Sequence, residues 1–180
     1  MKRLLILLRA VNVGGTANLP MESLRSALTA ADYHNVKTYI ASGNIILDTA
    51  LSAEDVESHV NGILNSQFNI SGERSIVRDS VAFNRTIKTN PFRDAAQQRP
   101  TMLHVHFLSS QPQPHAETNL TSYKGAERLR LDGPQLYIDY VNGAGQSPLT
   151  GRFLETALGT SGTSRNWNTI LKLSEMLGED

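Results

Sequence analysis

The sequence predicts an α+β protein made of two ferredoxin-like halves. Within residues 1–80, short apolar runs and amphipathic stretches follow the order strand, helix, strand, strand, helix, strand, which is the split βαβ arrangement. The same order starts again after residue 100. The turn glycines of the two hairpins, Gly43 and Gly133, lie 90 residues apart, half of the 180-residue chain. We therefore expect a first half at 1–80, a connector at 81–100, and a second half with an extra C-terminal helix at 101–180.

The first half begins with a continuous apolar run, which is typical of a strand covered on both faces. Pro20 suits the start of a helix, because its missing N–H needs no partner there. Ser42-Gly43-Asn44 has the chemistry of a tight hairpin turn. Ser52, followed three residues later by Asp55, predicts the capped start of a second helix. The strands are expected at Leu4–Leu8, Val36–Ala41, Ile45–Asp48 and within Glu73–Asp79.

The second half repeats these signals less regularly. Residues 81–100 contain Asn90-Pro91-Phe92 and the polar run Gln97–Pro100, and are expected to form a connector with about one helical turn. A helix is expected from Ser147-Pro148 to about Leu158, closed by Gly159. A short helix at Pro114–Leu120 and a final helix that carries Trp167 are also expected. The strands are expected at Leu103–Leu108, Glu127–Leu131, Gln135–Tyr140 and Thr160–Thr163.

Composition excludes several classes of function. Lys plus Arg and Asp plus Glu are both 17, so the formal net charge is zero, and a protein held to nucleic acid by bulk charge is excluded. The chain has no cysteine, which excludes disulfides, thiolate catalysis and Cys-based zinc sites. No apolar run approaches the length of a membrane span, and Arg9 interrupts the N-terminal one, which favours a buried strand over a signal peptide. A cytoplasmic location is expected.

The loop Asn12–Thr16 is the first candidate site. Backbone N–H groups of Gly14 and Gly15 are able to cradle an anion, because glycine allows close approach. The loop matches neither a P-loop nor G-x-G-x-x-G, so no nucleotide cofactor is predicted. The alternative is a plain strand-to-helix turn that needs positive φ. For Ser42 and Asn44, a turn formed for backbone reasons alone is the stronger interpretation.

The segment around Arg165 is the second candidate. A helix start presents unpaired N–H groups, and Arg165 adds a guanidinium that suits phosphate or carboxylate. Asn166 is an orienting hydrogen bonder in this hypothesis, and Lys172 lies two turns along the same face. The alternative is an N-cap by Ser164, an ordinary solvated helix face, and Trp167 as a core residue.

His104 and His106 share one face of a strand and are able to ligate one metal, with Asp139 as a third ligand. A half-buried strand with histidines on its outer face is the simpler interpretation, and no metal site is predicted. Alternation also predicts a polar sheet face in the second half that suits an interaction module. Its expected members are His104, His106, Arg128, Arg130, Tyr137 and Asp139.

Several motifs together resemble a known family. Leu7–Gly15 is similar to the LLRGINVGG opening of the bacterial domain-of-unknown-function family numbered 1697 (DUF1697), and Pro20–Arg25 is similar to its PMxxLR helix start. Its TYIQSGN hairpin resembles Thr38–Asn44, its NPF resembles Asn90–Phe92, and its closing TTRNWNTxxKL resembles Thr163–Leu173. The resemblance implies two ferredoxin-like halves and no particular reaction. It gives more weight to the polar signature residues as binding residues.

The sequence leaves two functional hypotheses. The first is a small anionic or polar ligand, bound between the N-terminal glycine loop and the C-terminal Arg-Asn-Trp helix. Its expected binding residues are Asn12, Gly14, Gly15, Ser42, Asn44, Arg165, Asn166 and Lys172. The alternative is a nucleic-acid or protein interaction module that uses the open sheet of the second half. A nucleic-acid partner is not favoured at zero net charge, and the sequence predicts neither a catalytic residue nor an oligomeric state.

Overall fold

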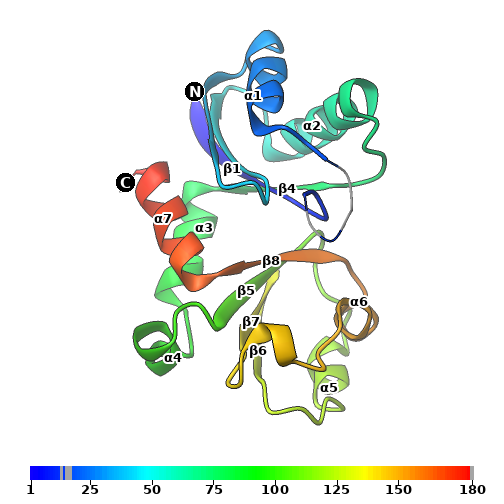
Figure 1. Ribbon diagram of the computed structural model, residues 1–180, viewed down its shortest axis with the longest axis vertical. Helices are drawn as coiled ribbons and strands as arrows, with labels where there is room; N and C mark the ends of the chain where they lie inside the picture. Colours follow the sequence, from blue (N-terminus) through cyan, green and yellow to red (C-terminus); the bar gives the residue numbers. More distant parts are fainter. Residues whose placement is uncertain (13, 15–17, 179–180) are drawn as a thin grey trace. The chain divides into compact units, whose positions relative to one another are not determined.

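The computed structural model describes residues 1–12, 14 and 18–178, which divide into two compact units (Figure 1). Unit 1 comprises Met1–Arg85 and Leu173–Asp180, and unit 2 comprises Thr86–Lys172. Among the described residues, no helix combines the length and the hydropathy needed to cross a bilayer.

Unit 1 contains a four-stranded antiparallel sheet in the order β2-β3-β1-β4. With its two helices, this is the ferredoxin-like arrangement that the sequence predicts. Its elements are β1 (Lys2–Leu8), α1 (Met21–Ala30), β2 (His34–Tyr39), β3 (Asn44–Thr49), α2 (Ala53–Phe68) and β4 (Ser75–Asp79).

Unit 2 repeats the arrangement with the order β6-β7-β5-β8, so the expected fold class is confirmed. Two helices, α3 (Ser80–Lys88) and α4 (Arg93–Gln98), precede its sheet. The sheet and its helices are β5 (Leu103–Leu108), α5 (Ala116–Leu120), β6 (Arg128–Asp132), β7 (Gln135–Asp139), α6 (Gly151–Leu158) and β8 (Gly162–Asn166). A 3₁₀ turn at Ala144–Gln146 precedes α6, and α7 (Trp167–Leu177) follows β8.

The repeat extends to individual hydrogen bonds. The N–H of Leu8, at the end of β1, donates to the carbonyl of Gly43, the residue before β3 (2.8 Å). In unit 2 the N–H of Leu108, at the end of β5, donates to the carbonyl of Pro134, the residue before β7 (2.9 Å). The next residues of the two units also match, because Arg9 and Ser109 both donate to the residue before the fourth strand.

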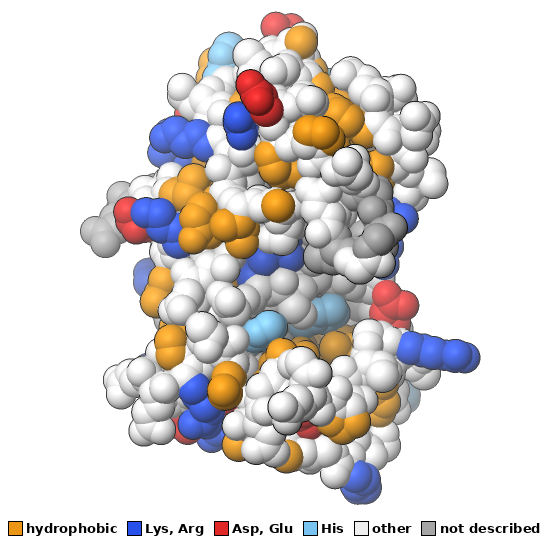
Figure 2. Space-filling model, in the orientation of Figure 1, with side chains coloured by type: hydrophobic (Ala, Val, Ile, Leu, Met, Phe, Trp, Pro, Cys, Tyr) orange, Lys and Arg blue, Asp and Glu red, His pale blue; other side chains and the backbone are white. Residues whose placement is uncertain are grey.

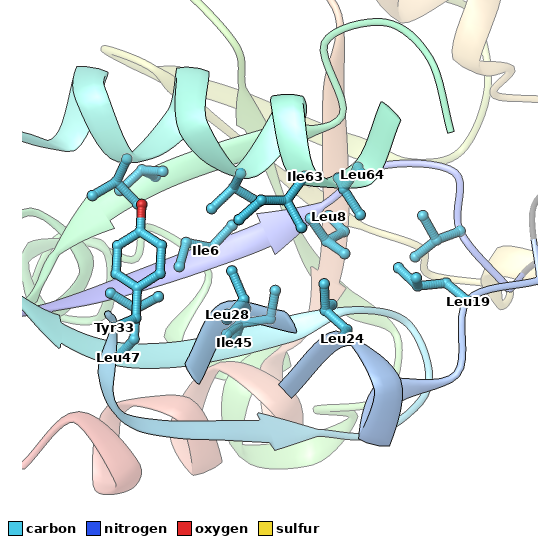
Figure 3. Close-up of a cluster of buried hydrophobic side chains, with 14 of the residues drawn as sticks. Ile6, Leu8, Leu19, Leu24, Leu28, Tyr33, Ile45, Leu47, Ile63 and Leu64 are labelled. Atoms are coloured by element: carbon cyan, nitrogen blue, oxygen red, sulfur yellow. The ribbon is translucent and has the colours of Figure 1, made fainter. Parts of the chain in front are cut away.

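Alternation along the central strands builds the core of unit 1. Figure 3 shows Ile6 and Leu8 of β1 pointing toward the side chains of α1 and α2, together with Ile45 and Leu47 of β3. Leu5 and Leu7 point to the opposite face by strand geometry and are equally buried. Burial on both faces explains why β1 is a continuous apolar run rather than an alternating one.

The predicted helix ends are partly confirmed. The Ser52 hydroxyl accepts from the N–H of Asp55 (3.0 Å) and caps α2, and Gly159 ends α6 at φ +71°. The expected start of α6 at Ser147-Pro148 is wrong, because the Thr150 hydroxyl caps the helix instead. Ser147 has another role, since its hydroxyl donates to Glu127.

The segment 81–100 is more ordered than expected, because it carries most of α3 and all of α4 in place of one helical turn. A carboxylate oxygen of Asp79 accepts from the N–H of Ala82 (2.7 Å), and this turn starts α3 directly at the end of β4. The end of α7 packs within unit 1, where the Ser174 hydroxyl donates to Asn84 (2.7 Å). The boundaries 1–80, 81–100 and 101–180 stay a prediction.

Candidate functional site

One end of the sheet in unit 1 collects backbone in the left-handed region. After β1, Ala10 (φ +52°), Asn12 (+54°) and Gly14 (+57°) adopt it, and in the β2–β3 connection Ile40 (+50°) and Gly43 (+80°) adopt it. Glycine and asparagine tolerate this conformation, whereas a β-branched residue in it is an outlier. Strain of this kind persists only where the surroundings enforce it, and it is common at functional sites.

Asn12 enforces part of this geometry. Its side-chain Nδ2 donates to the carbonyls of Leu19 (2.8 Å) and Ala41 (2.8 Å), and its Oδ1 accepts from the N–H of Leu19 (2.7 Å). Both amide hydrogens and one acceptor position are therefore engaged by backbone. Asn12 joins the two ends of the β1–α1 loop and ties them to the hairpin, so its observed contacts are structural.

Asn44 acts on the same hairpin from the other side. Its Nδ2 donates to the carbonyl of Tyr39 (2.9 Å) and to the hydroxyl of Ser42 (3.2 Å), and the residue is buried. Asn44 and Asn12 thus bind the carbonyls of Tyr39 and Ala41, the residues immediately before and after Ile40. Two side-chain amides hold Ile40 in its left-handed conformation while half of its surface stays exposed.

The glycines of this region differ in their requirements. A Cβ added to Gly43 would lie 2.7 Å from the Cβ of Leu8, so the hairpin needs glycine there for space as well as for φ. Gly14 is exposed, and an added Cβ would meet no atom within 4 Å. Gly15, the second predicted amide donor, lies outside the described residues.

Arg165 lies on strand β8, one element earlier than the predicted helix face. It is opposite Val105 of β5 and is 6% exposed. Its Nη1 donates to the Thr163 hydroxyl (2.8 Å) and to the Ser164 carbonyl (2.9 Å). Burial lowers the pKa of the guanidinium to about 10, which leaves it charged at neutral pH.

The start of α7 is arranged by Asn166. Its Oδ1 accepts from the N–H of Thr169 (2.9 Å), and the N–H of Trp167 donates to the Pro100 carbonyl (3.1 Å). The expected cap by Ser164 is therefore wrong: Ser164 is paired within the sheet opposite His106, and Asn166 is the residue at the helix start. Lys172 is partly buried, farther along α7.

The structure therefore brings the predicted residues together in two groups. In unit 1, Asn12 and Asn44 both hydrogen-bond to the β2–β3 connection that contains Ser42, and Gly14 follows Asn12 by two residues. Arg165 and Asn166 are adjacent in unit 2, and Lys172 is the last residue of that unit. The expectation that both groups bind the same ligand stays a prediction.

The predicted polar sheet face of unit 2 is wrong in its membership. The register places His104 opposite Ile138 and His106 opposite Leu136, whereas Tyr137 and Asp139 point to the other face. The two strands β5 and β7 are buried on both faces, so their sheet is not open. Asp139, considered above as a third metal ligand, is on the face opposite both histidines. No cluster of three metal-ligating side chains occurs among the described residues.

Asp139 instead joins a charged network that sequence reasoning missed. Its carboxylate accepts from Arg99 (Nη2, 2.7 Å) and Arg128 (Nε, 2.8 Å), and Arg128 also reaches Asp94 (2.7 Å) and stacks on Phe92 (4.6 Å to the ring centroid). Burial raises the pKa of Asp139, but hydrogen bonds from the two guanidinium groups outweigh it and hold the pKa below its usual value. The network fixes α4 to the sheet.

Ile40 was the second residue that sequence reasoning missed. The available signal was a β-branched residue two positions before a Ser-Gly-Asn turn, and nothing local to that turn reveals that Asn12 binds the carbonyl of Ala41. On the face shown in Figure 2, the described Lys and Arg side chains stand in separate small groups among neutral and acidic ones. This distribution agrees with the zero net charge of the chain.

These features define an α+β protein built from two ferredoxin-like units. The chain belongs to the family described as Protein of unknown function (DUF1697), whose model matches residues 1–137. A solved structure of the conserved bacterial protein SP0830 from Streptococcus pneumoniae has the same fold, with a TM-score of 0.73 and 18% identity over 98% of this chain and 98% of that chain. No curated protein matches the chain.

Proposed function

We propose that the protein binds a small anionic ligand and that Arg165 of β8 supplies the positive charge for it. The observation that carries the proposal is a guanidinium that is almost fully buried yet remains charged at neutral pH. Two of its hydrogen bonds, to the Thr163 hydroxyl and the Ser164 carbonyl, go to neutral oxygens and hold the side chain along its own strand. An anion that reaches such a group gains charge-assisted hydrogen bonds of more than ordinary strength, because the surroundings are poor in water.

Within unit 1, Gly14 is the proposed backbone contact for an anion. It is exposed and left-handed, and the Asn12 bonds hold the loop that carries it. Asn12, Ser42 and Asn44 act in this proposal by positioning backbone, and Asn166 does the same at the start of α7. A cytoplasmic location is also part of the proposal and is tested by cell fractionation.

The test is a calorimetric and thermal-unfolding titration with phosphate, citrate and adenosine monophosphate. A ligand present at about 100 times its dissociation constant raises the unfolding free energy by about 2.7 kcal/mol. Arg165→Met keeps the length of the side chain and removes the charge, so it is expected to abolish this stabilisation. Arg152→Met is the matched control, because Arg152 is an exposed arginine of the same unit.

The unfolding free energy without ligand separates binding from structure. If Arg165 is a buried cation that serves binding, Arg165→Met is expected to leave the unfolding free energy unchanged or to raise it when no anion is present. The opposite result is a strong loss of stability in Arg165→Met together with no stabilisation of the wild-type protein by any of the three anions. It would assign Arg165 to the fold and contradict the proposal. Gly14→Ala tests unit 1 separately, since the added Cβ has room and changes only the backbone.

A further inference from the structure

Unit 2 has a groove between an edge strand and a helix. Strand β6 is at the edge of the order β6-β7-β5-β8, so within the described residues no strand pairs with its outer side. In an antiparallel pair, every second residue points its N–H and C=O away from the partner strand. The outer side of β6 therefore presents backbone donors and acceptors along its five residues.

The groove beside this edge is apolar at its base. Leu129 and Leu131 point from β6 toward α5, and Leu120 of α5 closes the opposite wall. The two β6 leucines are only partly buried, so part of their apolar surface is accessible. The cavity has a volume of about 320 Å³ and is lined by Glu117, Leu120, Thr121, Leu129, Arg130 and Leu131.

Charge distinguishes the two faces of the edge. Arg130 alternates with the leucines and is exposed, and it has no ion pair among the described residues. Its two neighbours on that face already have partners. Arg128 donates to Asp94 and Asp139, and Asp132 accepts from the Thr89 hydroxyl. A strand added to β6 thus meets apolar side chains on one face and an unpaired cation on the other.

We propose that this edge binds an extended peptide by β-strand addition, and that the peptide alternates apolar with acidic residues. The apolar residues enter the groove between β6 and α5, and an acidic residue lies opposite Arg130. An edge strand beside a helix is the arrangement that strand-addition modules use, with backbone hydrogen bonds for affinity and side-chain pockets for specificity.

A second copy of the chain fits the same edge less well. If two β6 strands pair antiparallel about a two-fold axis centred on Arg130, Leu129 lies opposite the partner Leu131 and Arg128 opposite the partner Asp132. The two copies of Arg130 then face each other directly, and like charges directly opposite are destabilising. This repulsion favours an acidic peptide over self-association.

The experiment uses the full chain and fluorescein-labelled peptides in fluorescence anisotropy at low salt. The probe alternates Val and Glu. Its controls are a Val and Lys peptide with the same alternation, a Val and Glu peptide with its residues in two blocks, and the probe with alternate backbone nitrogens methylated. We expect only the Val and Glu probe to bind. Methylation removes the strand hydrogen bonds, block order destroys the alternation, and lysine in place of glutamate is repelled by Arg130.

Arg130→Glu is expected to weaken binding of the Val and Glu probe at least about tenfold and to create binding of the Val and Lys peptide. Arg152→Glu, which reverses an exposed charge elsewhere in unit 2, is expected to change neither. Circular dichroism and thermal unfolding verify that both variants are folded.

Three outcomes overturn the proposal. The first is an absence of binding by the Val and Glu probe. The second is binding that is indifferent to methylation or to Arg130→Glu. The third is a wild-type homodimer in sedimentation velocity that Leu131→Lys converts to a folded monomer, which assigns the edge to a second copy.

Discussion

The β2–β3 and β6–β7 ribbons occupy equivalent places in the two units, yet they are held in different ways. The β6–β7 turn contains only Gly133 and Pro134 between its strands, and glycine supplies the positive φ (+55°). The β2–β3 connection spans residues 40–43, and it needs Asn12 and Asn44 to bind the carbonyls around Ile40. The longer connection thus depends on side chains from outside the turn.

The open ends of the ribbons also differ. In unit 1, Arg3 donates to Asp48 (2.9 Å), and the Arg3 side chain is 42% exposed. In unit 2, the completely buried Asp139 accepts from two arginines. The same fold therefore stabilises its hairpin in two ways. Unit 1 uses neutral amides at the turn together with a partly exposed ion pair, and unit 2 uses a short turn together with a buried carboxylate. Each predicts its own response to mutation and to pH.

The largest effect is expected for Asp139→Ala. Removal of this buried carboxylate takes the shared acceptor from Arg99 and Arg128, which keep only the exposed Asp94 as an acidic partner among the described residues, so the unfolding free energy is expected to fall by about 3 kcal/mol in urea denaturation. Asp48→Ala is the matched variant in unit 1 and is expected to cost less than about 1 kcal/mol, because Asp48 is itself partly exposed (14%) and pairs with one arginine that is 42% exposed. Equal losses in the two variants would remove the distinction between the ribbons.

Asn12→Ala is expected to cost about 2 kcal/mol, because three hydrogen bonds to backbone are lost and alanine does not favour positive φ. Urea denaturation measures the loss. Asn18→Ala is the control, since Asn18 is an exposed asparagine of the same loop. A loss no larger than that of Asn18→Ala would show that the amide does not fasten the hairpin.

The pH dependence distinguishes the carboxylate of Asp139 from the side-chain amide of Asn12. The folded pKa of Asp139 is lowered, so its contribution to stability is complete above the unfolded pKa of about 4 and is lost as the pH falls through the folded value. Wild-type protein is therefore expected to lose more stability between pH 6 and pH 3 than Asp139→Asn. Asn12→Ala is expected to keep the wild-type pH profile, because an amide does not titrate. Parallel profiles for wild type and Asp139→Asn would contradict this assignment.

The smallest effect has the opposite sign. Ile40→Asn places a residue that tolerates the left-handed region at φ +50°, so the unfolding free energy is expected to rise by about 0.5–1 kcal/mol. Leu51→Asn, at an exposed apolar residue without positive φ, is expected to give no gain. A decrease in Ile40→Asn would show that the isoleucine contributes more by packing than it costs in strain.

The sequence predicted the elements of both sheets closely, because the signals are local. The apolar run at Leu4–Leu8, the Ser52 cap and the turn at Gly133 each depend on neighbours within a few residues. The errors fall where distant pairing intervenes. Ser164 was expected at a helix start, but its pairing with β5 extends β8 to Asn166, and α7 begins one residue later.

The candidate site divides in the same way. Motif chemistry was enough to select Asn12, Asn44 and Arg165 as unusual residues, since glycine loops and a lone arginine before a helix are visible in the chain. Their placement depends in part on residues far away in sequence. Asn12 binds the carbonyl of Ala41, 29 residues along the chain, and Arg165 lies on a strand that pairs with Val105.

Local periodicity and helix caps therefore predict the order of strands and helices, because a repeat of two or 3.6 residues and a capping hydroxyl involve only residues close together in the sequence. Strand register is a long-range property. It placed Asp139 on the face opposite His104 and His106, since a shift of one residue in pairing moves every side chain to the other face. The strain at Ile40 has the same origin: it exists because an asparagine from another loop binds the hairpin, and only the folded chain brings the two together.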